Sequence, residues 1–297
     1  MTGLLYMLFP ELAALSYDVF TRPAGAWARS PLLLAATPAM TAAMGTALTQ
    51  AMAYNVWSVT LTIASAIAIV RVMRSPVVPA VSAAFLPLVF GIASWWYPIS
   101  ITAVMSVLGV ASALYGWISG ARDVGRTPPP DVPAQADQME PAPRLKLWPF
   151  AFAAFLLLMY GLASVTGLRL ILFPPLVVIA FEMFSRVHRG PWTKRPFAMP
   201  LVCTIAAAIG LAALATFGAG PLSVAFSLLA SIAMLRVMRL HFPPALTIGL
   251  LPQIMPHADR SFVLAVALGS TALASAFLLA RPVLLNQLGA TSQPTSL

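Results

Sequence analysis

Apolar stretches separated by short polar segments fill most of the chain. A stretch of about 20 apolar residues can cross a bilayer as a helix, and shorter ones need neighbouring protein. Eleven such segments are predicted: 2–20, 32–50, 56–73, 79–96, 101–119, 147–165, 170–184, 201–217, 222–238, 242–255 and 262–279. The pattern predicts an all-α, polytopic transmembrane helical bundle.

The chain also repeats itself. LFPELAALSYDVFTR from Leu8 returns as LFPPLVVIAFEMFSR from Leu172, and RVMRSPVVPAVSAAFLP from Arg71 returns as RVMRLHFPPALTIGLLP from Arg236. The offset is 164 residues for the first pair and 165 for the second, so one single-residue gap aligns the copies. Two copies of one hydrophobic module are a common architecture of membrane transporters and channels.

The repeat divides the chain into five predicted parts. The first repeat covers 1–119, the second repeat covers 167–285, and a connecting transmembrane helix at 147–166 lies between them. Residues 120–146 are rich in Pro, Ala and Asp and lack apolar periodicity, which is typical of a flexible linker. The last part, 286–297, is predicted to be a flexible tail.

Composition excludes a water-soluble globule. The 297 residues are 60% hydrophobic and 8% charged, with a mean hydropathy of +0.89, whereas soluble domains carry about a quarter charged residues. The net charge of +9 does not indicate a nucleic-acid partner, because the basic residues lie between hydrophobic segments. The lone Cys203 lies in an apolar run, so the sequence offers neither a disulfide framework nor a thiol metal site.

The basic residues predict an orientation. If all eleven segments cross with the N-terminus outside, every Lys and Arg except Arg169 and Arg260 lies on the inner side. We predict a bacterial inner-membrane protein with its C-terminus and the linker in the cytoplasm. Five segments per repeat plus the connecting helix make the two repeats parallel, around a pseudo-two-fold axis along the membrane normal. Alternatively, the proline-containing segments are re-entrant, which removes crossings in pairs and leaves the repeats parallel.

Prolines at matching places predict helices that are broken within the membrane. Pro10 opens an apolar run that Pro174 and Pro175 open in the second repeat, and Pro79 corresponds to Pro244. Proline fits the first turn of a helix but not its interior. Helix N-termini carry partial positive charge and bind anions, so these breaks predict a site for a small anion between the repeats. The alternative is that the prolines only kink helices.

The motif RVMR precedes the second break in both repeats and supplies Arg71, Arg74, Arg236 and Arg239. Residues three apart share a helix face, so each pair points the same way. The functional interpretation is an electropositive inner mouth that concentrates anions. The alternative is that these arginines only anchor the inner ends of their helices.

Three acidic residues lie within predicted membrane segments. Asp18 and Glu182 are equivalent and precede Arg22 and Arg186 by one turn, which predicts i, i+4 ion pairs; a proton relay is the alternative. Glu11 has no acidic counterpart in the second repeat. It is interpreted either as a carboxylate stabilised by the helix dipole or as an asymmetric gate.

Other chemistry is not indicated. No two histidines have metal-ligand spacing, and the sequence contains no nucleotide-binding loop or hydrolase motif, so neither a metal, a cofactor nor an enzymatic activity is predicted. Gly45 and Gly210 are equivalent and surrounded by alanines, which predicts close helix packing.

The second break resembles the MRxxHPPAGA pattern of the HPP family of integral membrane proteins. The second repeat supplies MRLHFPPALT, with Met238, Arg239, His241, Pro243, Pro244 and Ala245. The first repeat supplies MRSPVVPAVS, with Met73, Arg74, Pro79 and Ala80. The resemblance covers both repeats, so the chain is similar to a tandem duplication of that module. It implies a transporter-like protein, since chloroplast members of the family are implicated in nitrite transport.

These observations predict a transporter or channel for a small solute, with its site between the repeats, and they favour an inorganic anion such as nitrite as the solute. The predicted substrate-binding residues are Pro10, Pro79, Pro174, Pro175, His241, Pro243, Pro244, Arg71, Arg74, Arg236 and Arg239. The bilayer and the anion are the expected partners, and a homo-oligomer is possible. The alternative function is a non-transporting scaffold or sensor subunit whose linker binds a cytoplasmic partner.

Overall fold

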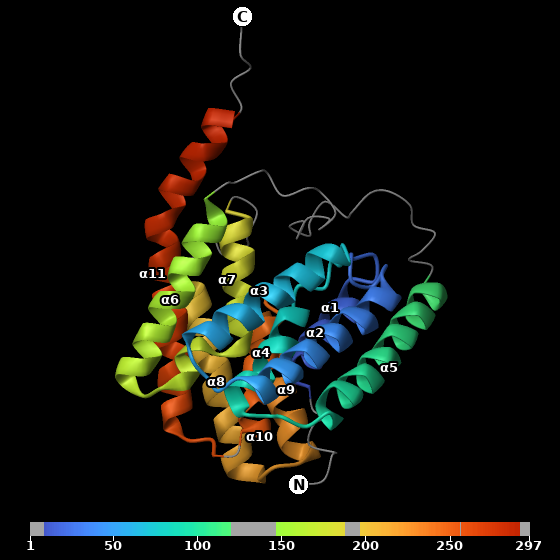
Figure 1. The fold of residues 1–297 in the computed structure, drawn as a ribbon. Coiled ribbons are helices and arrows are strands. Elements are labelled where there is room, and N and C mark those ends of the chain that lie inside the picture. Colours follow the sequence, from blue (N-terminus) through green and yellow to red (C-terminus); the bar gives the residue numbers. More distant parts are fainter. Residues whose placement is uncertain (1–8, 120–146, 188–196, 256, 292–297) are drawn as a thin grey trace, which may run out of the picture.

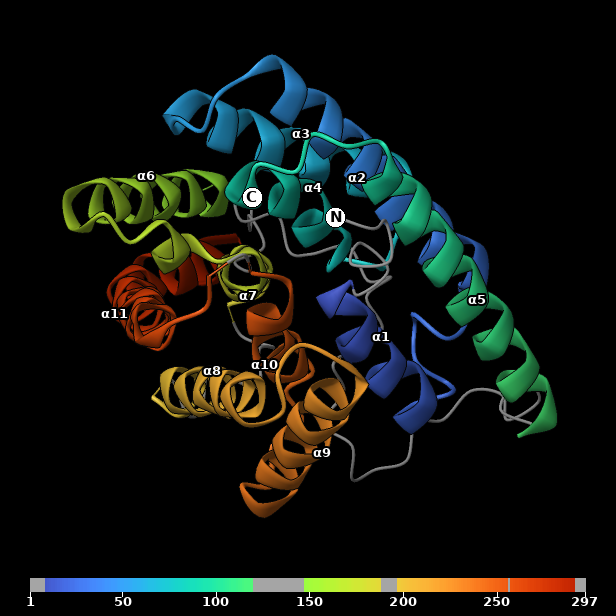
Figure 2. The same ribbon diagram turned by 90° about the horizontal axis from the view of Figure 1, so that it is seen from below.

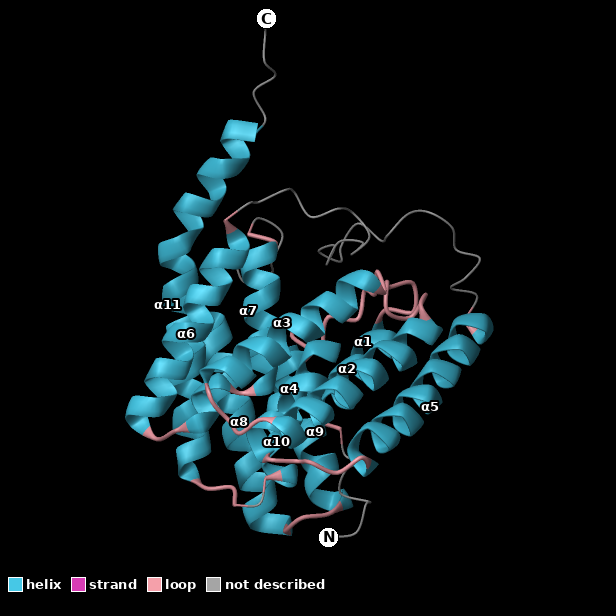
Figure 3. Ribbon diagram, viewed as in Figure 1, coloured by secondary structure: helices cyan, strands magenta, loops and turns pink. Residues whose placement is uncertain are grey.

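The computed structural model describes residues 9–119, 147–187, 197–255 and 257–291. Within these ranges the chain forms eleven α-helices and one short 3₁₀ helix, and it has no strand (Figure 3). The predicted all-α fold class is therefore confirmed.

Helices of the two repeats follow one another in the same order. The first repeat contains α1 (Pro10–Thr21), α2 (Pro31–Ala51), α3 (Val56–Val72), α4 (Ala80–Phe90) and α5 (Trp96–Ile118). The second repeat contains α7 (Pro174–Ser185), α8 (Ala198–Phe217), α9 (Pro221–Val237), α10 (Pro244–Ile254) and α11 (Arg260–Thr291). Between the repeats lie α6 (Trp148–Thr166) and the 3₁₀ helix η2 (Arg169–Leu172).

Five of the helices, α2, α5, α6, α8 and α11, are long and apolar enough to cross a membrane (Figure 1). Their outward faces carry large apolar side chains that no protein covers, among them Leu32 (84% exposed) and Val165 (87%). Such a surface is unfavourable in water and matches a hydrocarbon environment. The protein is thus a helical membrane protein.

The helices α1, α4, α7 and α10 are too short to cross alone. They contain 11 or 12 residues, and at 1.5 Å per residue they are about 17–18 Å long, against about 30 Å of bilayer hydrocarbon. In α4, every side chain from Ala80 to Val89 is buried. The prediction that all eleven segments cross is therefore not supported by their lengths, because hydropathy does not distinguish a short core helix from a spanning one.

The short helices form the centre of the molecule, and they join the two repeats (Figure 2). Within the first repeat, α2 packs against α3, α4 and α5, and α8 packs against α9, α10 and α11 in the same way. Across the repeats, α1 packs against α10 and α7 packs against α4. Because α1 corresponds to α7 and α4 to α10, each of these two contacts becomes the other when the repeats are exchanged. A pseudo-two-fold axis between the repeats requires this equivalence.

Two segments bear on the predicted boundaries. The linker at 120–146 lies outside the described residues. Of the predicted tail, residues 286–291 belong to α11, which continues to Thr291, and 292–297 lie outside the described residues. The apolar segment predicted to end at residue 279 therefore continues as one long helix, since Pro282 is accommodated within it.

Two equivalent glycines let the helices of each repeat cross at backbone contact. A Cβ atom on Gly45 of α2 would lie 2.1 Å from the carbonyl oxygen of Ala84 in α4. A Cβ atom on Gly210 of α8 would lie 2.0 Å from the carbonyl oxygen of Gly249 in α10. Ala84 and Gly249 are themselves equivalent in the repeat. The close packing predicted for these glycines is therefore found in both repeats.

The RVMR segments end α3 and α9 with the same turn. Arg74 and Arg239 have φ values of 49° and 52°, and they are the only non-glycine residues with positive φ in the described part of the chain. The amide of Arg74 donates to Arg71 O (3.0 Å), and that of Ser75 donates to Val70 O (2.9 Å). The second repeat has the equivalent bonds, so both helices end in a Schellman motif. Glycine usually occupies this left-handed position, so an arginine in both repeats suggests that its side chain is required.

We expect Arg74→Gly and Arg239→Gly to leave the fold intact and to stabilise it by up to about 1 kcal/mol each, because glycine adopts the left-handed conformation without strain. Arg71→Gly, three residues earlier and inside α3, is the matched control and should destabilise by about 1 kcal/mol. Thermal unfolding in detergent would measure both effects. Equal destabilisation by all three substitutions would contradict this account.

Candidate functional site

The predicted prolines begin the four short helices. Pro10 and Pro174 occupy the first position of α1 and α7, Pro244 that of α10, and Pro79 caps α4. The proline pattern therefore marked the helix starts correctly. Pro175 follows Pro174 in the first turn of α7, and Pro243 is the residue before α10.

Backbone donors at each of the four helix starts form hydrogen bonds within the chain. Leu12 N donates to Phe9 O and Leu176 N to Phe173 O, each at 2.9 Å. The starts of α4 and α10 contain the same kind of bond, for example Ser82 N to Pro79 O at 3.0 Å. The breaks do not leave these amides free for an anion, because the residues before each helix form tight turns that accept their bonds. A ligand between the repeats must therefore be held mainly by side chains.

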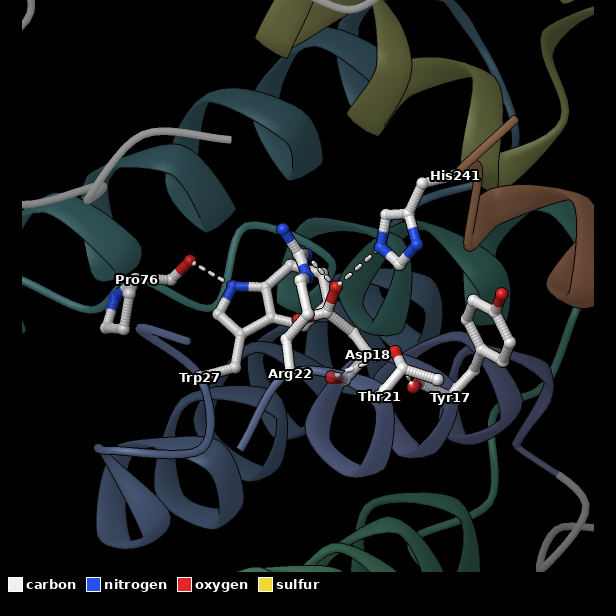
Figure 4. A network of polar contacts seen from close by, with 7 residues as sticks. All are labelled: Tyr17, Asp18, Thr21, Arg22, Trp27, Pro76 and His241. Carbon is white, nitrogen blue, oxygen red and sulfur yellow. Dashed lines mark hydrogen bonds and ion pairs between the residues drawn. The ribbon is translucent and has the colours of Figure 1, made fainter. Parts of the chain in front are cut away.

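A charged cluster joins the two repeats near the end of α1. We define it as Asp18, Arg22, Glu182, Arg186 and His241. The guanidinium of Arg22 forms an ion pair with Asp18, one turn away on α1, as the i, i+4 spacing predicts. His241, in the loop before α10, places Nε2 3.1 Å from Asp18 Oδ1 (Figure 4). The imidazole ring also stacks on Tyr17, with ring centroids 5.5 Å apart.

Glu182 completes the cluster from the second repeat. Its carboxylate interacts electrostatically with Arg186 on its own segment and with Arg22 of the first repeat. Arg22 therefore interacts with acidic side chains of both repeats, Asp18 of the first and Glu182 of the second. Pro76, the residue equivalent to His241, has no ionisable side chain, and its carbonyl accepts a bond from Trp27 Nε1 (2.8 Å, Figure 4).

A second group of polar residues lies at the N-terminal end of α1. Glu11 is 2% exposed, and neither carboxyl oxygen has a hydrogen bond of ordinary geometry within the described residues. Its carboxyl group lies beside the hydroxyl group of Ser82 on α4 and within electrostatic reach of Tyr97 on α5. The hydroxyl of Tyr97 donates to Ala83 O at 2.9 Å. We call Glu11, Ser82 and Tyr97 the Glu11 site.

One face of α1 connects the two polar groups. Glu11 and Asp18 are seven residues apart, which is two turns or about 10 Å along the helix, and both are buried. Ala14 and Leu15 lie between them on the buried side. The buried face of α1, a helix that packs against α10 of the second repeat, therefore carries ionisable groups at two positions separated by apolar residues.

The four predicted arginines lie outside these buried groups. Arg71, Arg74, Arg236 and Arg239 are exposed at the ends of α3 and α9. Arg71 lies over the ring of Trp148 with 5.0 Å between its guanidinium carbon and the ring centroid. Arg74 and Arg239 each precede, by two residues, the position taken by Pro76 or His241. Arg239 is thus two residues from His241, which belongs to the charged cluster.

Sequence reasoning missed several buried polar residues. Ser82 and Tyr97 are ordinary in the sequence, and only the packing of α4 and α5 on α1 brings them to Glu11. It also missed buried hydroxyls one turn apart on α3 and α9: Ser58, Thr62, Ser223 and Ser227. These occupy equivalent positions, so comparing polar residues between the two repeats would have found them. In α9, Ser227 Oγ donates to Gly249 O (2.7 Å).

No family model, curated protein or solved structure matches the chain. Its class therefore follows from the structure itself: a helical membrane protein built from two repeats, with a cluster of ionisable residues around the buried Asp18 between them.

Proposed function

We propose that the protein is a transporter or channel for a small solute, and that the solute passes between the two repeats along the short helices. The observation that carries this proposal is the cluster of ionisable side chains, buried at Asp18 and half-buried at Arg22, Glu182 and His241, that joins the repeats of a membrane protein. Such residues are costly in a bilayer, and they commonly mark ion or substrate paths. Half-length helices at a repeat interface are the usual surroundings of a transporter site.

The basic residues support an anion as the solute. Arg71, Arg74, Arg236 and Arg239 are exposed at equivalent helix ends, where four positive charges raise the local concentration of anions. Arg74 and Arg239 keep a left-handed backbone that costs free energy with an arginine, so a requirement for the side chain explains why both repeats retain it. The resemblance to the HPP family favours nitrite among small anions.

The same charges support an orientation. We infer that the ends of α3 and α9 that carry the arginines face the cytoplasm of a bacterial inner membrane, since basic residues are retained on that side. Arg71 and Trp148 contact one another there, whereas Arg169, which is predicted to lie outside, contacts Tyr54 beside the opposite end of α3. An inner electropositive mouth would then collect or release the anion on the cytoplasmic side.

Replacing the paired arginines tests the solute. Arg74→Gln with Arg239→Gln should lower nitrite uptake into proteoliposomes by about tenfold at low ionic strength, and by less in high salt. The control is Arg260→Gln, which removes one charge at the start of α11. Uptake that is unchanged in the double variant, with the protein inserted normally, would contradict a role for these arginines in anion entry.

A further inference from the structure

The Glu11 site has no equivalent in the second repeat. Glu11, Ser82 and Tyr97 correspond to Pro175, Thr247 and Phe262. The buried carboxyl and the phenol therefore belong to one repeat only, although the helices that carry them occur in both. Packing alone does not require this asymmetry, because Pro175 and Phe262 fill the same positions in the second repeat with apolar side chains.

Among the residues that the structure describes, no positive side chain near Glu11 would balance an ionised carboxylate. Of the helices packed against α1, α10 carries no titratable residue, and α5 carries Tyr97 beside the carboxyl and Tyr115 at its far end. The helix α4, which supplies Ser82, carries no titratable residue either. On α1 itself, Tyr17 and Asp18 lie about two turns away. In the described residues Glu11 forms no ion pair, and Arg22 is engaged by Asp18.

A buried carboxyl in these surroundings is held at the lowest cost in its neutral form, because an isolated charge in an apolar medium is strongly unfavourable. A protonated carboxyl is also a hydrogen-bond donor, and the hydroxyl oxygen of Ser82 is an acceptor beside it. A metal cation fits less well. It would need several oxygen ligands, and the N-terminus of α1 presents the positive end of the helix dipole.

We propose that Glu11 is a proton-binding site, and that it couples the movement of a proton to that of the solute. When the interface between the repeats admits water from one side, the carboxyl O–H bond breaks, the electron pair stays on the carboxylate oxygen and the proton passes to water. The N-terminus of α1 stabilises the carboxylate until a proton returns. The coupling rests on the proposed transport function, whereas proton binding does not.

Infrared spectroscopy of the full chain in lipid vesicles tests proton binding without transport. The wild-type protein should show the carbonyl stretch of a protonated carboxylic acid at neutral pH, and this band should shift in D₂O. Glu11→Gln should remove the band. The control is Asp259→Asn, because hydrogen bonds from the hydroxyl and amide of Ser261 lower the pKa of this exposed aspartate and keep it ionised.

Further outcomes keep the proposal testable. If Glu11→Gln does not insert, Glu11→Asp should move the band without removing it. A band that survives Glu11→Gln, or that is absent from the wild type, overturns the proposal. A Glu11 carboxylate that responds to Na⁺ but not to pH also overturns it, in favour of a metal cation.

Transport supplies the second part of the test. Nitrite uptake by the wild type should increase when a pH gradient is imposed, and Glu11→Gln should lose that response while Asp259→Asn keeps it. A response that persists in Glu11→Gln contradicts the coupling. If the wild type does not transport nitrite but the infrared band behaves as expected, the proposed solute fails and the proton site stands.

Discussion

Gly45→Ala and Gly210→Ala are each expected to destabilise the protein severely. The added methyl group would lie 2.1 Å from Ala84 O in one variant and 2.0 Å from Gly249 O in the other. Both obstacles are backbone atoms of buried helices, so no side chain can rotate away and α4 or α10 must shift. Overpacking commonly costs about 1–3 kcal/mol where side chains can adjust, and we expect at least about 3 kcal/mol here.

A third glycine provides the control. Gly161 lies within α6, and a Cβ atom there would meet nothing within 4 Å. Gly161→Ala should be neutral or stabilise by up to about 1 kcal/mol, because alanine is the better helix former. Thermal unfolding of the three variants in detergent measures the difference. Unfolding temperatures for Gly45→Ala and Gly210→Ala that equal that of Gly161→Ala would show that the repeats do not cross at backbone contact.

Arg22→Gln is expected to destabilise the protein by about 3 kcal/mol, because removing one partner of a buried ion pair leaves the other charge uncompensated. The Asp18 side chain is 4% exposed, and Glu182 of the second repeat would lose the same positive partner. His241 remains 3.1 Å from Asp18 and can compensate only part of the loss.

The comparison for this variant is Arg29→Gln, which makes the same chemical change at an exposed position and should have little effect on stability. The double variant Asp18→Asn with Arg22→Gln should recover part of the lost stability, because it removes both charges of the pair. Denaturant titration of all the variants gives the coupling energy between the two residues. Additive effects of the two single substitutions would show that Asp18 and Arg22 are not energetically coupled.

The sequence predicted where the short helices begin better than it predicted which helices cross the membrane. The repeat and the prolines located the starts of α1, α4, α7 and α10, since a proline is compatible with the first turn of a helix and not with its interior. Hydropathy did not predict that these helices are half the length of a crossing and are covered by protein. An apolar segment has the same composition whether lipid or other helices surround it.

The site was predicted only where its members are close in the sequence. The Asp18–Arg22 pair follows from helical spacing, but the contact of Asp18 with His241 joins residues 223 positions apart and depends on how α1 packs against α10. The Glu11 site combines residues from three helices for the same reason. The left-handed backbone of Arg74 and Arg239 was also not predicted, because glycine is the residue that usually indicates it.

The most direct test of the account is anion uptake by proteoliposomes that contain the purified full-length protein. Nitrite, nitrate, chloride and formate would be compared, with and without a pH gradient, against vesicles without protein. We predict saturable nitrite uptake that depends on the protein and increases when the gradient is imposed. No uptake of any of the four anions, by protein shown to be folded and inserted, would contradict the proposal that this is an anion transporter or channel.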